Sequence, residues 1–154
     1  MPFTTAQKQA ILDHIYGGYD ADSANWELKP EADLYIGLSS EDPGVDGTGF
    51  TEPVDGGSFK DGYSRVEVAN TTTNWNNATA AEPSVKSNKT PIEFAACSGN
   101  AWPEVKWWGI FTDNNPASNP IDWAALDVNK TVGVGDEAKF SAGELKTQLQ
   151  NPSV

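Results

Sequence analysis

Hydrophobic and polar residues alternate along most of the chain, in short runs that end at glycine, proline or asparagine. In one such run Val66 and Val68 alternate with Arg65 and Glu67, which is the period of a half-buried strand. The pattern predicts about eight strands, at Leu34–Ser39, Tyr63–Ala69, Ile92–Ala95, Val105–Thr112, Ile121–Leu126, Lys130–Val134, Ala138–Ser141 and Leu145–Leu149.

The beginning of the chain has a helical pattern instead. Ile11, Leu12 and Ile15 form a narrow apolar stripe, residues 4–7 fit a capping box, and two glycines follow the stripe. A helix over residues 4–16 is therefore expected. Because its stripe is narrow, we expect it to pack one face on the domain or on a neighbouring subunit.

The order of these elements predicts the fold class. Half-polar strands without intervening helices favour antiparallel sheets with one solvated face. The expected fold is mainly β, an antiparallel β-sandwich (jelly-roll or Ig-like) of about eight strands with a short N-terminal α-helix. The expected domains are residues 1–18, a helix for anchoring or oligomerisation, and residues 33–150, the β-sandwich.

A long acidic, glycine-rich loop, residues 41–62, separates the first two expected strands. A loop of this length in a compact domain is usually functional or disordered. Asp42 and Asp46 match two positions of an EF-type calcium loop, but Gly44 stands at its middle ligand position and Pro53 at its closing one. We therefore expect turns here, with Asp42 and Asp46 as the only metal candidates, and no cofactor. The loop is expected to touch a neighbouring subunit or a host surface.

Charge narrows the range of partners. The 154 residues carry 22 acidic and ten basic side chains, for a net charge of −12. Nucleic-acid binding and anionic membrane surfaces both require clustered basic residues, so neither is expected. No apolar run approaches the length of a membrane span, and the N-terminus lacks the apolar core of a secretory signal. Cys97 is the single cysteine, which excludes an intrachain disulfide, and its apolar surroundings predict a buried thiol.

Catalytic groups are scarce in this sequence. His14 is the single histidine, it lies in the expected helix, and no nucleophile elbow is present. Glu104 lies near Trp107 and Trp108, where desolvation could raise the pKa of a carboxyl. Acid–base catalysis by carboxylates needs a second acidic residue, and the sequence does not indicate which one it would be. The adjacent tryptophans also face opposite sides of a strand. We therefore expect no enzymatic activity.

Three tryptophans, Trp26, Trp75 and Trp102, lie in expected loops or at strand edges. Aromatic rings in such places either stack on a carbohydrate or cover a small core. Together with Ile11, Leu12 and Ile15 of the helical stripe, they are the candidate interface residues.

Twelve short motifs follow one another along residues 5–150, and their order is informative. They are Ile11–Ile15, Leu34–Ser39, Glu52-Pro53, Gly62–Val66, Trp75, Ser87–Phe94, Trp102 to Val105, Gly109–Phe111, Trp123–Leu126, Lys130–Val132, Gly135-Asp136 and Phe140–Leu145. Their order resembles that of the corresponding motifs in small virion proteins of tailed bacteriophages, the tail-fibre or Gp80-like family. The chain departs from that pattern in a longer acidic insert, Asp55–Asp61, and a longer turn at 114–120.

The resemblance implies a non-enzymatic structural protein of the virion, made in the host cytoplasm. Tail-fibre or tail-tip placement is the first expectation, and capsid decoration as a cement or head-fibre protein is the alternative. A carbohydrate-binding or glycan-degrading module is the alternative from another class. The expected partners are other virion proteins and further copies of the chain, with a trimer favoured, and a host-surface glycan is a possible ligand.

Overall fold

The computed structural model describes residues 11–12 and 33–149. Most of the helix expected over residues 4–16 lies outside the described residues, as does most of the expected domain at 1–18. Ile11 and Leu12 have helical backbone, and Leu12 is buried. Two residues do not establish a helix, so the helix remains a prediction.

Residues 33–149 form strands, turns and irregular segments, and none of them is helical. The ten strands are β1 (Asp33–Ser39), β2 (Val54–Asp55), β3 (Ser58–Phe59), β4 (Val66–Ala69), β5 (Ser84–Ser87), β6 (Ile92–Glu93), β7 (Val105–Phe111), β8 (Asp122–Lys130), β9 (Lys139–Phe140) and β10 (Lys146–Leu149). The expectation of a mainly β chain with antiparallel pairing is confirmed. Within this part of the chain, no helix is long and apolar enough to cross a bilayer.

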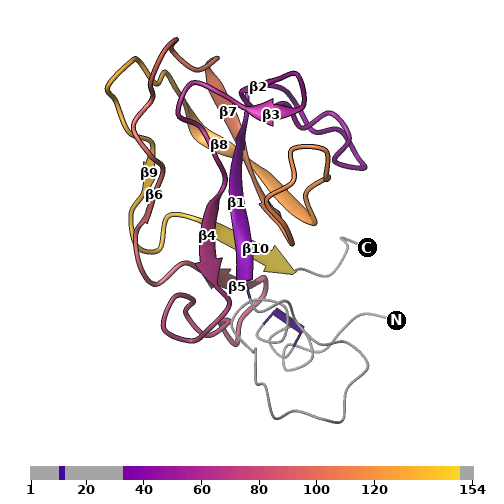
Figure 1. Ribbon diagram of the computed structural model, residues 1–154. Helices are drawn as coiled ribbons and strands as arrows, with labels where there is room; N and C mark the ends of the chain where they lie inside the picture. The colour runs from indigo at the N-terminus through magenta and orange to yellow at the C-terminus, as the bar shows by residue number, and fades with distance from the viewer. Residues whose placement is uncertain (1–10, 13–32, 150–154) are drawn as a thin grey trace. The chain divides into compact units, whose positions relative to one another are not determined.

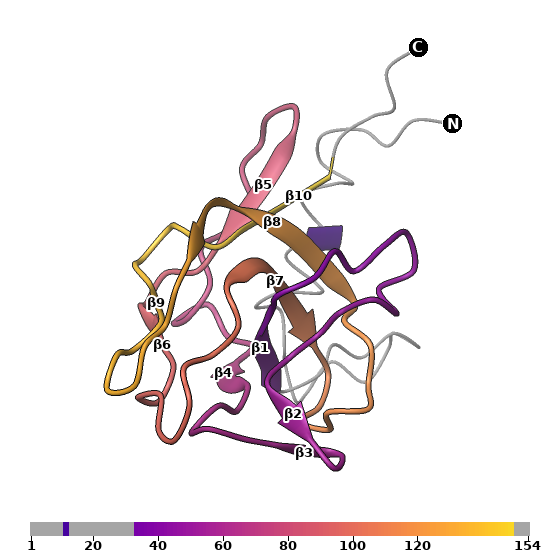
Figure 2. The ribbon, with the colours of Figure 1, turned by 90° about the horizontal axis from the view of Figure 1, so that it is seen from above.

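The largest sheet has four strands in the order β4-β1-β7-β8 (Figure 1). β7 pairs antiparallel with β1 on one side and with β8 on the other, and Figure 2 shows it between them. Ile36 on β1 and Ile110 on β7 are paired and fully buried. These two central strands are buried along most of their length, which explains why they read in sequence as the longest apolar runs.

Three two-stranded sheets complete the described fold: β2-β3, β6-β9 and β10-β5. β2 and β3 form an antiparallel hairpin turned by Gly56 and Gly57, both at positive φ. β10 pairs antiparallel with β5 from Lys146 opposite Ser87 to Leu149 opposite Ser84.

The chain divides into two compact units. One contains residues 33–68 and 92–139, with β1, β2, β3, β6, β7, β8 and most of β4. The other contains the described residues 11–12, 69–91 and 140–149, with β5 and β10. The sheet that carries the long loop belongs to the first unit.

The observed strands differ from the expected ones in several places. Of the expected strand Tyr63–Ala69 only Val66–Ala69 forms, and of Ile92–Ala95 only Ile92–Glu93. Lys130–Val134 was expected to be a separate strand, and this is wrong, because β8 runs on to Lys130 and residues 131–134 are irregular. Val132 is buried, and its carbonyl accepts a hydrogen bond from the Trp102 amide, so a loop contact explains its apolar character. β2, β3 and β5 were not expected, because each lies in a segment whose composition predicted a loop.

Candidate functional site

The long loop lies back over one face of the four-stranded sheet, at a pair of glycines. Gly37 on β1 and Gly109 on β7 stand directly opposite each other. A Cβ atom at Gly37 would lie 2.6 Å from Oε1 of Glu52, and one at Gly109 would lie 2.7 Å from Cε2 of Phe50. Because paired residues share one face of a sheet, the two glycines leave room for Phe50 and Glu52 of the loop.

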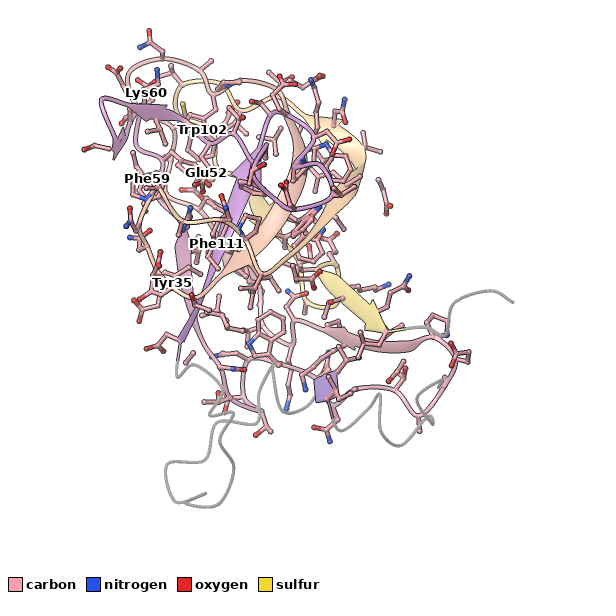
Figure 3. All side chains as sticks on the ribbon, turned by 90° about the vertical axis from the view of Figure 1, so that its right-hand side faces the viewer. Tyr35, Glu52, Phe59, Lys60, Trp102 and Phe111 are labelled. Carbon is pink, nitrogen blue, oxygen red and sulfur yellow. The ribbon has the colours of Figure 1, made fainter. Side chains whose placement is uncertain are left out.

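Glu52 is held there by the chain's single arginine. Nη2 of Arg65 lies 2.7 Å from Oε2 of Glu52, and Nε lies 3.0 Å from Oε1. The side chains are 0% and 3% exposed, respectively. This is a forked, fully desolvated ion pair, the arrangement in which arginine binds a carboxylate most strongly. Figure 3 labels Glu52 alongside this sheet.

Arg65 also binds the end of β7 and the turn that follows it. Its guanidinium carbon lies 3.3 Å from the centre of the Phe111 ring. Nη1 donates to the carbonyl of Asp113 at 3.0 Å and to Oγ of Ser118 at 2.8 Å, and Nη2 donates to the carbonyl of Ser118. All the N–H donors of the guanidinium therefore have acceptors, so the buried charge is fully hydrogen-bonded.

Tyr63 completes the buried network. Its hydroxyl donates to Oε1 of Glu52 at 2.7 Å and accepts from the amide of Leu38 at 2.8 Å. Burial, followed by the neighbouring Glu52 carboxylate, raises the pKa of Tyr63 well above its usual value. The phenol therefore stays protonated and can donate to the carboxylate. We call Gly37, Glu52, Tyr63, Arg65 and Phe111 the loop clamp.

An aromatic cluster holds the other end of the loop. Tyr63 packs edge-on against Trp102 and Phe59, and it stacks on Phe94. The indole N–H of Trp102 donates to the carbonyl of Asp61 at 2.9 Å. Asp61 has a positive φ of 56°, unusual for a residue with a side chain. These contacts fix both ends of the loop segment between Glu52 and Tyr63.

The loop's first half carries a protruding tip. Asp42 and Asp46 each accept hydrogen bonds from the chain two residues on, Asp42 from the Gly44 amide and Asp46 from the amide and hydroxyl of Thr48. A Cβ atom at Gly47 would lie 3.2 Å from Pro120 and from Trp123, so the base of the tip packs on the sheet. Val45, at the end of the tip, is fully exposed at 102%.

The two metal candidates have local roles in this tip. Asp42 and Asp46 stabilise tight turns, and hydrogen bonds from Thr48 lower the pKa of Asp46. Within residues 11–12 and 33–149, no three His, Cys, Asp or Glu side chains lie together in a group that could hold a metal ion. The tip is thus stabilised by hydrogen bonds between its own residues.

The structure places the candidate interface residues as follows. Trp75 is 1% exposed and Trp102 is 3% exposed, so in this chain both rings are packing residues rather than surface rings. Leu12 is buried and Ile11 is half-buried. Ile15 and Trp26 lie outside the described residues.

The remaining sequence candidates are not brought together. Glu104 is exposed and accepts a hydrogen bond from Asn129, while Trp108 is buried and Trp107 half-buried. Cys97 is buried, as expected, and its thiol donates to the carbonyl of Asn100.

Sequence reasoning missed the loop clamp, although two signals pointed to it. Arg65 is the only arginine in a strongly acidic chain, and it lies just before valines that alternate with polar residues. Gly37 and Gly109 interrupt two apolar strands, which often marks the close approach of another backbone or side chain. The arrangement neutralises its own charges inside the fold, so its chemical capacity is to hold the loop in place.

Comparison with known proteins agrees with a structural role. Among curated proteins, no sequence matches the chain. A family model described as podophage GP4 fiber I protein gp80 matches residues 2–148, almost the whole length. The chain therefore belongs to the family of the podophage GP4 fiber I protein gp80, a family of phage fibre components of the virion.

Proposed function

We propose that this protein is a non-enzymatic structural component of a phage tail fibre or tail tip, assembled as a homo-oligomer with its loops facing outward. The observation that carries the proposal is the loop clamp. A buried Arg65–Glu52 pair fixes a long loop to a β scaffold, and the loop's tip ends in the fully exposed Val45. Family membership supports the same reading.

A fixed, protruding tip suits a contact role. Because the clamp and the turns at Asp42 and Asp46 order the loop before any partner arrives, little conformational entropy is lost when the tip binds. The exposed valine then supplies a small apolar anchor in an otherwise acidic loop. Its proposed partner is another virion protein or a host-surface glycan.

We also propose two features of the fold, a sandwich and an N-terminal helix. The antiparallel sheets form a β-sandwich, and the segment 1–18 is a helix that anchors the protein or joins subunits. The four-stranded sheet with two buried central strands supports the sandwich, because such strands need cover on both faces.

Location in the particle is the test of this function. Electron microscopy of intact virions at subunit resolution, combined with copy number by quantitative mass spectrometry, should place the protein on the tail in a few to a few dozen copies. Hundreds of copies on the head would instead establish capsid decoration. Depolymerisation of host polysaccharide by the purified protein would overturn the non-enzymatic assignment.

A further inference from the structure

Two exposed apolar side chains come from segments that meet at the base of the loop's tip. Val45 at the end of the tip is 102% exposed, and Ile121, just before β8, is 49% exposed. A Cβ atom at Gly47 would lie 3.2 Å from both Pro120 and Trp123. The base of the tip therefore lies beside the start of β8 (Figure 2). We call Val45, Ile121 and the half-buried Trp123 the tip patch.

Backbone contacts hold the tip patch in place before any partner binds. The Ile121 amide donates to the carbonyl of Ile110 at 2.7 Å, which ties Ile121 to β7. The Gly49 amide donates to the carbonyl of Pro43 at 3.0 Å and closes the tip. An apolar surface that is already ordered loses little conformational entropy on binding. The tip patch is therefore a candidate contact surface.

The side chains of the patch favour a protein partner over a glycan. Stacking on a sugar needs an exposed aromatic face. Within residues 11–12 and 33–149, every aromatic ring is buried or half-buried, and the tip at Gly47 covers part of the Trp123 ring. The large apolar side chains that are exposed there are all aliphatic: Val45, Ile121, Val128 and Val134. Aliphatic groups gain most by leaving water for an apolar pocket, such as a protein surface offers.

Charge indicates which kind of protein fits. Asp42 and Asp46 are exposed on either side of Val45, and neither forms an ion pair with a described residue. Glu41 lies 3.9 Å from Lys106, but residues 41–59 contain no basic side chain of their own. A second copy of the chain, with its net charge of −12, would bring more negative charge to this patch. A basic surface would be attracted to it instead.

We propose that the tip patch docks on another virion protein, at an apolar pocket whose rim carries lysine or arginine. This inference rests on the proposed function and deepens it, because it selects a virion protein over a host glycan as the partner of the tip. Val45 and Ile121 enter the pocket, and Asp42 and Asp46 face its basic rim. The apolar side chains give most of the affinity, while the charges steer the approach and fix the orientation.

Binding to phage particles separates the two contributions. The probe is purified particles that lack this protein, and co-sedimentation measures the dissociation constant of the full-length chain. Ile121→Ser should weaken binding roughly tenfold at any salt concentration, because it removes an apolar anchor without adding charge. Asp46→Asn can keep the turn, and it should weaken binding roughly threefold at about 50 mM salt but not at about 1 M, where charges are screened.

The matched control for this measurement is Val134→Ser, which removes an exposed valine from a separate turn. It should bind like the wild type, and circular dichroism checks that each variant stays folded. A wild type that does not bind the particles would overturn the proposal. Equal weakening by Ile121→Ser and Val134→Ser, or an effect of Asp46→Asn that ignores salt, would do the same.

Crosslinking in intact particles identifies the partner directly. With Cys97→Ala as background, a benzophenone label on Val45→Cys reacts with whatever the tip contacts. Mass spectrometry should find a segment of a different virion protein, with several lysine or arginine residues around the crosslinked position. A crosslink to a copy of this chain or to an acidic segment, or no crosslink, would contradict the proposal. So would binding to purified host polysaccharide that Ile121→Ser abolishes. Because location in the virion is measured separately, the partner can prove wrong while the fibre role holds.

Discussion

The carboxylate of Glu52 lies in the fork of the Arg65 guanidinium, with Oε2 2.7 Å from Nη2, in the interior of an acidic chain that has no other arginine. The pair joins a loop residue to the residue just before β4, thirteen positions later. It thus turns a long excursion into a fixed part of the domain.

Breaking this pair from one side should be strongly destabilising. Arg65→Met leaves the Glu52 carboxylate buried without its counterion, and we expect a loss of about 3–5 kcal/mol in the free energy of unfolding by urea denaturation. The double variant Glu52→Leu, Arg65→Met removes both charges and should lose less than Arg65→Met alone. As a control, Lys139→Met breaks the exposed Lys139–Glu93 pair and should leave the unfolding midpoint unchanged. A double variant less stable than Arg65→Met would argue against a desolvated pair.

Gly37→Ala tests the space beneath the loop. The new methyl group would meet Oε1 of Glu52 at 2.6 Å and the Phe111 ring at 2.8 Å, so the clamp must shift. We expect a loss of about 1–3 kcal/mol and faster proteolysis within residues 41–62. Gly133→Ala is the matched control, because only the flexible side chain of Asp136 lies near that position. Equal losses for the two variants would show that the close approach at Gly37 is unimportant.

Removal of the Tyr63 hydroxyl should also weaken the clamp. Tyr63→Phe leaves the Leu38 amide without its side-chain acceptor and Glu52 with one donor fewer, at a cost of about 1–3 kcal/mol in the free energy of unfolding. Chemical denaturation at neutral pH measures this cost.

The raised pKa of Tyr63 adds a prediction at alkaline pH. The phenol ionises more readily in the unfolded chain, so its contribution is fully present below pH about 10 and is lost as pH rises toward the folded-state pKa. The wild type should therefore lose stability above pH about 10 more steeply than Tyr63→Phe. Tyr35→Phe, which removes an exposed phenol, should retain most of that loss. Identical alkaline profiles for wild type and Tyr63→Phe would contradict the assignment.

Val45 provides a test of the loop's contact role. Val45→Asp changes only a fully exposed side chain, so the purified protein should unfold at the wild-type midpoint. Complementation of a phage lacking the wild-type copy should nonetheless give fewer intact or adsorbing particles. Thr72→Asp, an exposed change in the other compact unit, is the control. Normal particle yield and adsorption with Val45→Asp would exclude the tip as a contact.

The sequence predicted the parts of this fold whose information is local. β1 and β7 were found because their seven residues are mostly apolar, and a mostly apolar strand indicates burial directly. The full length of β8 was missed because its bulge interrupts the alternation between Leu126 and Lys130. The clamp was missed because it depends on which strands become neighbours, and neither Glu52 nor Arg65 carries a sign of its partner.

The loop has a different character from the one its composition suggested. Its acidic and glycine-rich residues favour an open excursion for display, but Glu52 and Pro53 are buried, and the exposed parts include the tip around Val45 and the β2–β3 turn at residues 55–58. Composition gives the average polarity of a segment, whereas Phe50 and Glu52 are two individual residues that anchor the loop to the sheet.

The glycine pair at Gly37 and Gly109 separates two tasks within one loop. Phe50 and Glu52 fill the space above the two glycines, while Val45 at the tip is fully exposed. A mutation at the tip therefore leaves the anchoring intact. The exposed surface of the loop can change during evolution while the sheet that holds the loop stays the same. Under the proposed contact role, such a division lets the contact surface change while the architecture is preserved.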